Sequence, residues 1–243
     1  MESFDCADFH SRHYVRLNHR RLEHLASLGL DVSGRTVLEL GAGIGDLSTF
    51  FLDRECAVTS VEVRPENRKR MDENIRAQYA FYPGSRRPAR HRIVDLDLDA
   101  VERPDLGSFE IAFCYGVLYH LRDPAPVIRL MGSTCEGLCL VETCVSCDPG
   151  EIVQAVDEDP RYASQAFHGM GCRPSRAWVF RALAQVFPHV YVPRTQPFHE
   201  EFPLDWEERD PAPGRLTRAV FVASRAPLSN AMLLDSLPAR QVR

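Results

Sequence analysis

Three glycines and one acidic residue form the densest group of chemically useful residues in the chain. Gly41, Gly43 and Gly45 follow the apolar run Val37–Leu40, and Glu39 stands two residues before the first glycine. Such a run is typical of a parallel strand buried on both faces, and ligands of open α/β sheets bind at the carboxyl ends of such strands. The glycines allow a sharp turn and a close approach of the backbone to a ligand. A carboxylate at Glu39 suits a ligand that carries an amine and is poorly placed beside a pyrophosphate.

The spacing of the glycines and a second acid narrow the ligand further. Asp46 occupies the position of the third glycine in the dinucleotide pattern G-x-G-x-x-G, which argues against a nicotinamide cofactor. Cys56–Val63 is predicted to be a second strand, and Glu62 near its end lies 21 residues after Gly41. An acid at this position binds the two hydroxyls of a ribose.

Two later segments complete a resemblance to a known family. Arg92–Leu96 is a predicted strand that ends in Asp95, and Phe109–Pro124 holds a longer apolar strand followed by Leu-Tyr-His. Together with the glycine motif and Glu62, these segments resemble the class I S-adenosylmethionine-dependent methyltransferases. The similarity covers about residues 34–145, with weaker support up to residue 225. The resemblance implies S-adenosyl-L-methionine as the cofactor.

The resemblance also implies how the cofactor is held. The glycine turn lies under the methionine and ribose parts, Glu39 reaches toward the amino group, Glu62 binds the ribose hydroxyls and Asp95 binds the adenine amine. Asp97 and Asp99 are alternatives to Asp95 for the contact with the adenine amine. Tyr14 could equally be part of a helix that only covers the sheet. The implied cofactor-binding residues are Glu39, Gly41, Ala42, Gly43, Gly45, Glu62, Val63, Asp95, Leu96, Tyr115, Gly116 and Tyr14.

His120 is the best candidate for chemistry beyond cofactor binding. It follows the predicted fourth strand, where the resembled family often places residues that face the transferred methyl group. A histidine titrates near neutral pH and can accept a proton from a hydroxyl or an ammonium group. Tyr119 could orient the acceptor or rim the pocket. Packing roles for both residues remain open alternatives.

The C-terminal half holds a second set of polar residues, suited to an anionic acceptor. Guanidinium groups bind carboxylates and phosphates well, so we expect one of these groups on the acceptor. The candidate acceptor-binding residues, for which surface roles are an equal alternative, are His168, Arg173, Arg194, Gln196 and His199. Leu-Tyr-His and a later Pro-Ser-Arg-Ala-Trp faintly resemble bacterial enzymes that carboxymethylate the tRNA wobble uridine, but we expect neither the extra N-terminal domain nor the RNA binding of those enzymes.

Positioning these residues requires an α/β fold. We expect a Rossmann-like, seven-stranded, mostly parallel sheet with helices on both faces and the last strand antiparallel. One domain is predicted over residues 1–225, with a helical lid at about 9–29 and an insertion over the substrate side at about 146–173 that holds one short helix. Residues 226–243 are predicted to be a C-terminal tail.

Prolines and glycines mark several predicted boundaries. Gly29 suits the C-cap of the first helix, and Pro65 suits the first position of a later one. Pro174–Phe187 is predicted to be a further helix, with His189–Thr195 and Thr217–Ser224 as the last two strands.

The composition is that of an ordinary globular protein. Hydrophobic residues make up 44% and charged residues 26%, and a net charge of −5 gives no general attraction to nucleic acid or to an anionic membrane. No apolar run reaches the ~18 residues of a membrane span, and the amino terminus lacks the basic and apolar regions of a signal peptide. The eight cysteines are scattered, with a single CxxC at Cys144–Cys147, so we expect free thiols in a cytoplasmic protein and no metal site.

These observations predict methyl transfer from S-adenosylmethionine to a small-molecule acceptor, at oxygen or nitrogen in preference to carbon. Because of the basic run Ser85–Arg92, an RNA-modifying methyl- or carboxymethyltransferase remains an alternative. If this run faced the cofactor pocket, the structure would favour that alternative. A non-catalytic scaffold that binds the cofactor is another alternative. We expect no nucleic-acid or membrane partner, and either a monomer or a homodimer.

Overall fold

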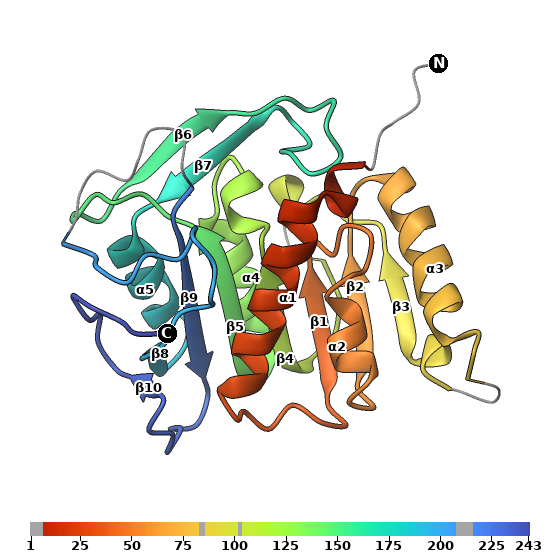
Figure 1. Cartoon of the computed structure of the whole chain (residues 1–243), viewed down its shortest axis with the longest axis horizontal. Coiled ribbons are helices and arrows are strands. Elements are labelled where there is room, and N and C mark those ends of the chain that lie inside the picture. The colour runs from red at the N-terminus through yellow and green to blue at the C-terminus, as the bar shows by residue number, and fades with distance from the viewer. Residues whose placement is uncertain (1–6, 83–85, 102–103, 208–215) are drawn as a thin grey trace.

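A mostly parallel sheet organises the computed structural model, which describes residues 7–82, 86–101, 104–207 and 216–243 (Figure 1). The strands are β1 (Thr36–Leu40), β2 (Ala57–Val61), β3 (His91–Val94), β4 (Phe109–Tyr115), β5 (Cys135–Cys144), β6 (Val153–Asp157), β7 (Met170–Pro174), β8 (His189–Pro193), β9 (Arg218–Ser224) and β10 (Leu233–Leu234). The α-helices are α1 (Arg12–Ser27), α2 (Ser48–Leu52), α3 (Pro65–Tyr79), α4 (Ala125–Thr134) and α5 (Arg176–Ala184). Short 3-10 helices are η1 (Ala7–His10), η2 (Pro88–Arg90), η3 (Leu98–Ala100) and η4 (Leu118–His120).

The strand order confirms the predicted fold class. Within the described residues the large sheet runs β10-β8-β9-β5-β4-β1-β2-β3. The pairs from β3 to β5 are parallel, whereas β9 runs antiparallel to both β5 and β8. Seven of these strands match the predicted sheet, and the antiparallel β9 is the last of the seven along the chain. Such an order brings the carboxyl ends of β1, β2 and β4 to one edge.

The eighth strand comes from the segment predicted to be a tail, and this prediction was wrong. In β10, Leu233 and Leu234 pair antiparallel with Pro193 and Val192 at the edge of β8. Further on, the buried side chain of Gln241 donates to the carbonyl oxygen of Pro193 over 2.5 Å. The segment 226–243 is therefore built into the domain, because it covers the open edge of β8.

Alternating residues of each strand face two different helical layers. In β4, Ile111 and Phe113 pack with residues of α1, α2 and α3, whereas Ala112 and Cys114 pack with α4 and α5. All four side chains are almost fully buried. This burial on both faces explains why the strand sequences are apolar at nearly every position.

Capping residues set the helix boundaries close to the predicted positions. Gly29 follows α1 with a φ of +62°, and Pro65 is the first residue of α3, as predicted. The last helix begins later than predicted, because the side chain of Ser175 accepts a hydrogen bond from the backbone N–H of Trp178, while Pro174 belongs to β7. Ser175 is therefore the N-cap of α5.

The predicted insertion is a β-hairpin rather than a segment with a helix. Strands β6 and β7 pair antiparallel, from Val153 opposite Pro174 to Asp157 opposite Met170. We call residues 153–174 the flap; it lies above the carboxyl ends of the central strands (Figure 1). All of residues 146–173 are described, and none of them is helical. The sequence hid the hairpin because exposed residues fill β6 and leave no alternating apolar pattern.

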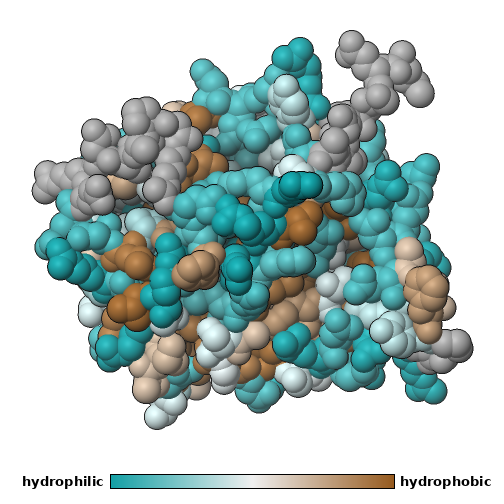
Figure 2. Space-filling model, in the orientation of Figure 1, coloured by the Kyte–Doolittle hydropathy of each residue, from teal (hydrophilic) through white to brown (hydrophobic). Residues whose placement is uncertain are grey.

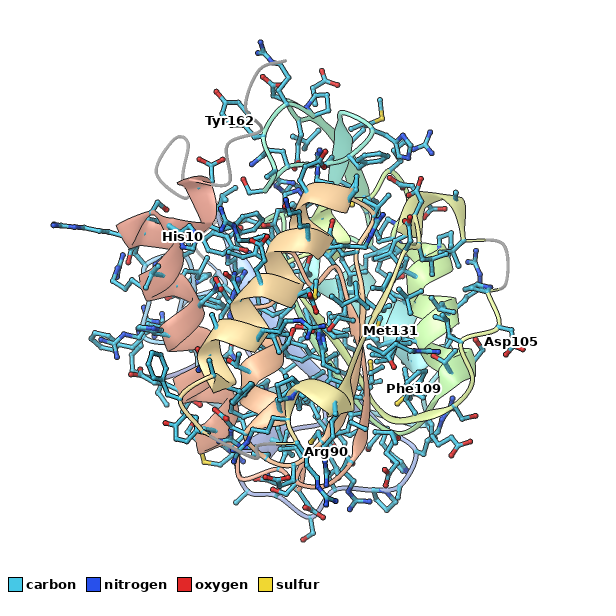
Figure 3. The ribbon with its side chains drawn as sticks, turned by 90° about the vertical axis from the view of Figure 1, so that its right-hand side faces the viewer. His10, Arg90, Asp105, Phe109, Met131 and Tyr162 are labelled. Atoms are coloured by element: carbon cyan, nitrogen blue, oxygen red, sulfur yellow. The ribbon has the colours of Figure 1, made fainter. Side chains whose placement is uncertain are left out.

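The basic run lies far from the flap. Arg87 pairs with Asp53 at 3.6 Å and with Glu55 at 3.3 Å, near the amino end of β3. Figure 3 shows Arg90 at the opposite end of the molecule from Tyr162 of the flap. Residues 83–85, which include the start of this run, lie outside the described part of the chain.

The described surface and thiols show nothing unusual for such a domain. The face in Figure 2 is mostly hydrophilic, with scattered apolar patches. No helix among the described residues is both long and apolar enough to cross a membrane. The described cysteines are free thiols, including both members of the CxxC.

Candidate functional site

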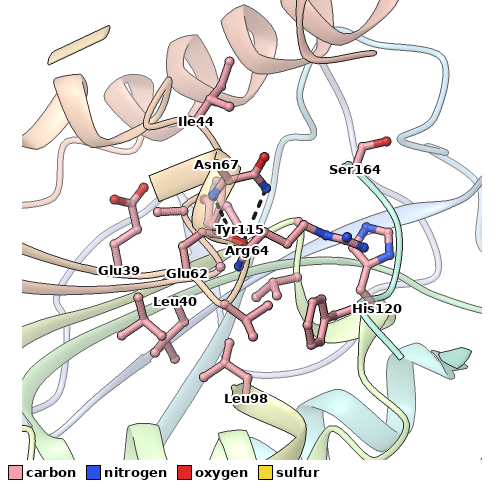
Figure 4. Close-up of a pocket in the computed structure, with 18 of the residues that line it drawn as sticks. Glu39, Leu40, Ile44, Glu62, Arg64, Asn67, Leu98, Tyr115, His120 and Ser164 are labelled. Atoms are coloured by element: carbon pink, nitrogen blue, oxygen red, sulfur yellow. Dashed lines mark hydrogen bonds between the residues drawn. The ribbon is translucent and has the colours of Figure 1, made fainter. Parts of the chain in front are cut away.

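A deep cavity opens where the carboxyl ends of β1, β2 and β4 meet beneath the flap (Figure 4). Its empty space, including the mouth toward solvent, is about 950 Å³. The walls come from the glycine turn after β1, the segments after β2, β3 and β4, helix α1 and the flap. Among the predicted cofactor-binding residues, those that line the cavity are Tyr14, Glu39, Gly41, Ala42, Gly43, Glu62, Val63, Leu96, Tyr115 and Gly116.

The glycine turn adopts a backbone that other residues rarely take. Gly41, Gly43 and Gly45 have φ values of +68°, +56° and +86°. The N–H groups of Gly41 and Ala42 donate to the carbonyl oxygen of Val61 over 2.9 and 3.0 Å, which fixes the turn against the end of β2. The turn is thus preformed at the strand end where the sequence placed it. Gly45 itself supports the turn from outside the cavity wall, packed against α3.

Gly41→Ala should cost more stability than the matched change Gly34→Ala. Both glycines have positive φ, so both substitutions carry backbone strain of about 1 kcal/mol. A Cβ at Gly34 meets nothing within 4 Å, whereas a Cβ at Gly41 would lie 2.4 Å from Val117. We expect this clash to add about 1 kcal/mol to the loss of unfolding free energy in urea. Equal losses for the two variants would show that the contact with Val117 is unimportant.

Glu62 holds the turn as well as facing the cavity. Its carboxylate accepts hydrogen bonds from the backbone N–H groups of Gly43 and Arg64, both over 2.9 Å, and Asn67 donates over 3.4 Å (Figure 4). Burial raises the pKa of Glu62, and these hydrogen bonds oppose the shift. The carboxylate is therefore fixed in place at the cavity wall, with Arg64 and Asn67 as neighbours that the sequence did not single out.

Glu39 is more enclosed than expected. Its Oε2 atom accepts hydrogen bonds from Ser48 over 2.5 Å and from Ser60 over 2.6 Å. Burial raises the pKa of Glu39 to about 7. The carboxylate thus ties β1 to α2 and β2 beneath the turn. Asp46, which also lines the cavity and pairs with Asn18 of α1, is a second carboxylate near the same end.

Asp95 does not lie in the cavity. Its side chain is 67% exposed and pairs with Arg68 at 2.7 Å. The chain turns after β3, where the side chain of Asp97 accepts a hydrogen bond from the N–H of Asp99 over 2.9 Å. This turn brings Leu96, Asp97, Leu98 and Asp99 to the cavity wall instead. The structure therefore favours Asp97, two residues after Asp95, as the acid that faces the cavity, and the sequence left Asp97 open as an alternative.

Buried charges lie beside the end of β4. Arg21 of α1 is 2.7 Å from Glu142 of β5, which is 3.1 Å from Arg218 of β9, and Arg218 also binds Glu201. A Cβ at Gly116 would come within 3.2 Å of the Arg21 guanidinium. Sequence patterns could not reveal this network, because its members belong to separate elements.

His120 and Tyr119 have different surroundings. His120 lines the cavity, and its Nδ1 lies 2.5 Å from the Oε2 atom of Glu158 in the flap. Tyr119 is buried outside the cavity wall, and its hydroxyl accepts a hydrogen bond from Arg218 over 3.2 Å. The catalytic role predicted for Tyr119 does not fit this position, and the packing alternative does.

The five predicted acceptor-binding residues do not converge on the cavity, and none of them lines it. Arg194 donates to the carbonyl oxygen of Ala231, while Gln196 and His199 are buried beyond β8. Strand β8 is separated from β4 by β9 and β5, so residues after β8 are too far along the edge.

The other two belong to the flap. His168 lies at the rim, 2.6 Å from Asp97, and Arg173 lies 3.3 Å from Glu158. Glu158 is the flap residue that sequence reasoning missed, because it stands in an acidic stretch without periodicity.

Comparisons with known proteins agree with this geometry. A family model described as a methyltransferase domain matches residues 10–195. The ubiquinone biosynthesis O-methyltransferase of Xanthomonas euvesicatoria pv. vesicatoria is 31% identical over 117 residues, or 48% of this chain. The enzyme of the same name from Psychrobacter arcticus is 26% identical over 134 residues, or 54% of this chain. These matches span only 45% and 47% of the two relatives' own lengths.

Solved structures share the fold. The N-terminal domain of EvdMO1, crystallised in the presence of S-adenosylhomocysteine (SAH) and D-fucose, has a TM-score of 0.64 and 19% sequence identity. The match covers 88% of this chain and 84% of that one. The glycopeptide N-methyltransferase MtfA, complexed with S-adenosylmethionine, has a TM-score of 0.54 at 18% identity, covering 86% of this chain and 94% of that one. With the family match over most of its length and this cavity at the ends of β1, β2 and β4, the chain belongs to the class I S-adenosylmethionine-dependent methyltransferases.

Proposed function

We propose that this methyltransferase acts on a hydroxyl or amino group of a small-molecule acceptor, and that His120 accepts the proton that the acceptor loses. One observation carries the proposal. His120 lies in the wall of the cofactor cavity, and a buried carboxylate holds its Nδ1. Among the described residues, the side-chain hydrogen bond of His120 uses Nδ1 and leaves the other ring nitrogen, Nε2, for the acceptor. A neutral imidazole in this state can receive a proton.

The residues of the cavity fit S-adenosylmethionine. Glu62 offers a fixed carboxylate for the ribose hydroxyls, and Asp97 with Leu98 offers an acceptor and an apolar wall for the adenine. At the other end, the Arg21 guanidinium lies directly behind Gly116 of the cavity wall, where its positive charge favours the carboxylate of the methionine part. Asp46 is a candidate for the amino group, in addition to Glu39.

The chemistry asks little more of the protein. The bound cofactor supplies an electrophilic methyl group whose leaving group is a neutral thioether, so no general acid is needed. The chain's own residues must align the acceptor, exclude water and remove one proton. Phe9, Tyr14 and the flap residues Ala163 and Phe167 contribute apolar surface to the cavity wall, which suits a small, partly apolar acceptor.

Two findings support a small molecule over RNA. The basic run lies at the amino end of β3, and none of its described residues lines the cavity. The curated relatives carry names that refer to O-methylation in ubiquinone biosynthesis, which favours oxygen as the acceptor atom. Phenols and catechols are therefore the first acceptors to test.

Calorimetry followed by an acceptor screen tests the proposal. We expect S-adenosylmethionine and S-adenosylhomocysteine to bind with micromolar dissociation constants and NAD not to bind. Transfer of a radiolabelled methyl group should then occur to at least one phenol, catechol or amine of a mixed panel, with bulk tRNA as the comparison acceptor. Labelling of tRNA alone would overturn the small-molecule assignment, and cofactor binding without transfer to any acceptor would favour the scaffold alternative.

A further inference from the structure

Glu158 connects the flap to the wall of the cavity. It directly follows β6, and its side chain is only 3% exposed. Its Oε2 atom accepts a hydrogen bond from the backbone N–H of Ala166 over 2.7 Å and lies 2.5 Å from His120 Nδ1. Its Oε1 atom lies 3.3 Å from the Arg173 guanidinium. Every oxygen of this carboxylate is thus engaged, and one contact reaches the proposed base.

A glycine allows the flap to come this close. A Cβ at Gly171 would lie 2.4 Å from the carbonyl oxygen of Tyr119 and 2.9 Å from Glu158 Oε1. Next to it, the thiol of Cys172 donates to the carbonyl oxygen of Leu118 over 3.5 Å. Strand β7 therefore packs directly against the 3-10 helix η4 that carries His120.

We propose that Glu158 is a positioning residue for the methyl-transfer reaction, which holds His120 with Nδ1 protonated and Nε2 available to the acceptor. This inference rests on the proposed role of His120. Because the same carboxylate oxygen accepts from Ala166, the position of Glu158 depends on the loop between β6 and β7. The proton acceptor is therefore complete only when this loop is in place over the cavity.

The loop also contacts the cofactor side of the cavity. Arg64, whose N–H binds Glu62, donates through its guanidinium to the carbonyl oxygen of Gln165 over 3.1 Å. Asn67 donates to the carbonyl oxygen of Ala163 over 3.4 Å. The loop between β6 and β7 thus contacts both the predicted ribose site and Glu158. Cofactor binding and the positioning of His120 therefore depend on the same loop.

The charges around His120 define the expected protonation states. Its ring faces Glu158 and Arg173 of the flap and Arg218 of β9. Burial lowers the pKa of His120, and the Glu158 carboxylate opposes this shift. Burial would raise the pKa of Glu158, but its hydrogen bond and charge interaction with His120, its hydrogen bond to Ala166 and the charge of Arg173 outweigh burial and lower it. A neutral imidazole beside an ionised carboxylate follows, with the proton on Nδ1.

An NMR titration of the histidine C–H signals, in protein saturated with S-adenosylhomocysteine, tests this arrangement without an acceptor. The His120 signal is assigned by its absence in His120→Ala. Glu158→Gln keeps the shape but removes the charge that favours the imidazolium, so we expect the apparent pKa of His120 to fall by about 1. Glu151→Gln is the matched control, since Glu151 is exposed and pairs with Arg181 at 2.8 Å. An unchanged pKa of His120 in Glu158→Gln would overturn the inference.

Turnover separates a positioning role from a purely structural one. With the most active acceptor of the panel, Glu158→Gln should reduce kcat about tenfold, shift the acid limb of the pH profile downward and leave the affinity for S-adenosylhomocysteine unchanged. In the His120→Ala background the same change should have little further effect, because Glu158 acts through His120. If Glu158→Gln does not fold, Glu158→Asp, which retains the charge, should give a His120 pKa near that of the unchanged protein.

The possible failures are distinguishable. Normal turnover in His120→Ala would refute the proposed base itself, whatever Glu158 does. A large loss in His120→Ala together with normal kcat and a normal pH profile in Glu158→Gln would refute only the positioning role. An equal loss in Glu158→Gln and Glu151→Gln would also refute the positioning role, because Glu151 pairs with Arg181 and not with His120.

Discussion

His120→Ala is expected to lower kcat by about 10²- to 10⁴-fold, while the affinity for S-adenosylhomocysteine stays within about twofold. The imidazole lines the cavity from η4, which follows β4, whereas Glu62, Asp97 and the glycine turn, which hold the cofactor in our proposal, follow β2, β3 and β1. Removing it should therefore leave binding intact and take away the group that receives the acceptor's proton. Steady-state kinetics and calorimetry on the same preparation measure the two effects separately.

The pH dependence of turnover gives the same residue a second signature. A histidine accepts a proton only in its neutral form, so kcat of the unmodified enzyme should fall as the pH drops through the pKa of His120. Because burial lowers that pKa, the fall should occur below the usual histidine range. His189→Ala, at the start of β8 and away from the cavity, is the control and should keep both kcat and the acid limb. A His120→Ala variant with normal turnover across the pH range would leave this histidine a packing role only.

Glu62→Ala should weaken cofactor binding by about 1.5–3 kcal/mol, or roughly 10- to 100-fold in the dissociation constant. The variant loses the charge-assisted contacts that we propose between Glu62 and the ribose hydroxyls. It also leaves the N–H groups of Gly43 and Arg64 without their carboxylate, so the glycine turn loses a support. Calorimetric titration with S-adenosylhomocysteine measures the change.

Asp95 and Asp97 supply matched controls for this experiment. Asp95→Ala should leave the affinity unchanged, because that side chain lies outside the cavity against Arg68. Asp97→Ala should weaken binding, because Asp97 lies in the cavity wall. Unaltered affinity in Glu62→Ala would contradict the role of Glu62 at the ribose hydroxyls. A loss of affinity in Asp95→Ala but not in Asp97→Ala would identify Asp95 as the residue that binds the adenine amine.

The sequence alone predicted the parts of the protein that depend on neighbouring residues. An apolar run followed by alternating glycines specifies a buried strand and a turn with positive φ, and the structure has both at Gly41 and Gly43. Pro65 at the start of α3 and Gly29 after α1 mark boundaries through their own backbone preferences. The strand order then follows from the repeated strand–helix units, and it places the strand ends, with Glu62 and His120, at one edge.

The tertiary structure decided everything that depends on contacts between distant segments. His120 and Glu158 are 38 residues apart, and Arg21 meets Glu142 and Arg218 from three different elements. Neither periodicity nor spacing encodes such pairs, because each residue satisfies its own local pattern equally well without its partner. The choice between Asp95 and Asp97 likewise depends on a turn after β3 in which Leu98 is buried against the core. Local backbone preferences therefore determined where the glycine turn forms at the strand ends, whereas long-range packing determined which side chains line the cavity beside it.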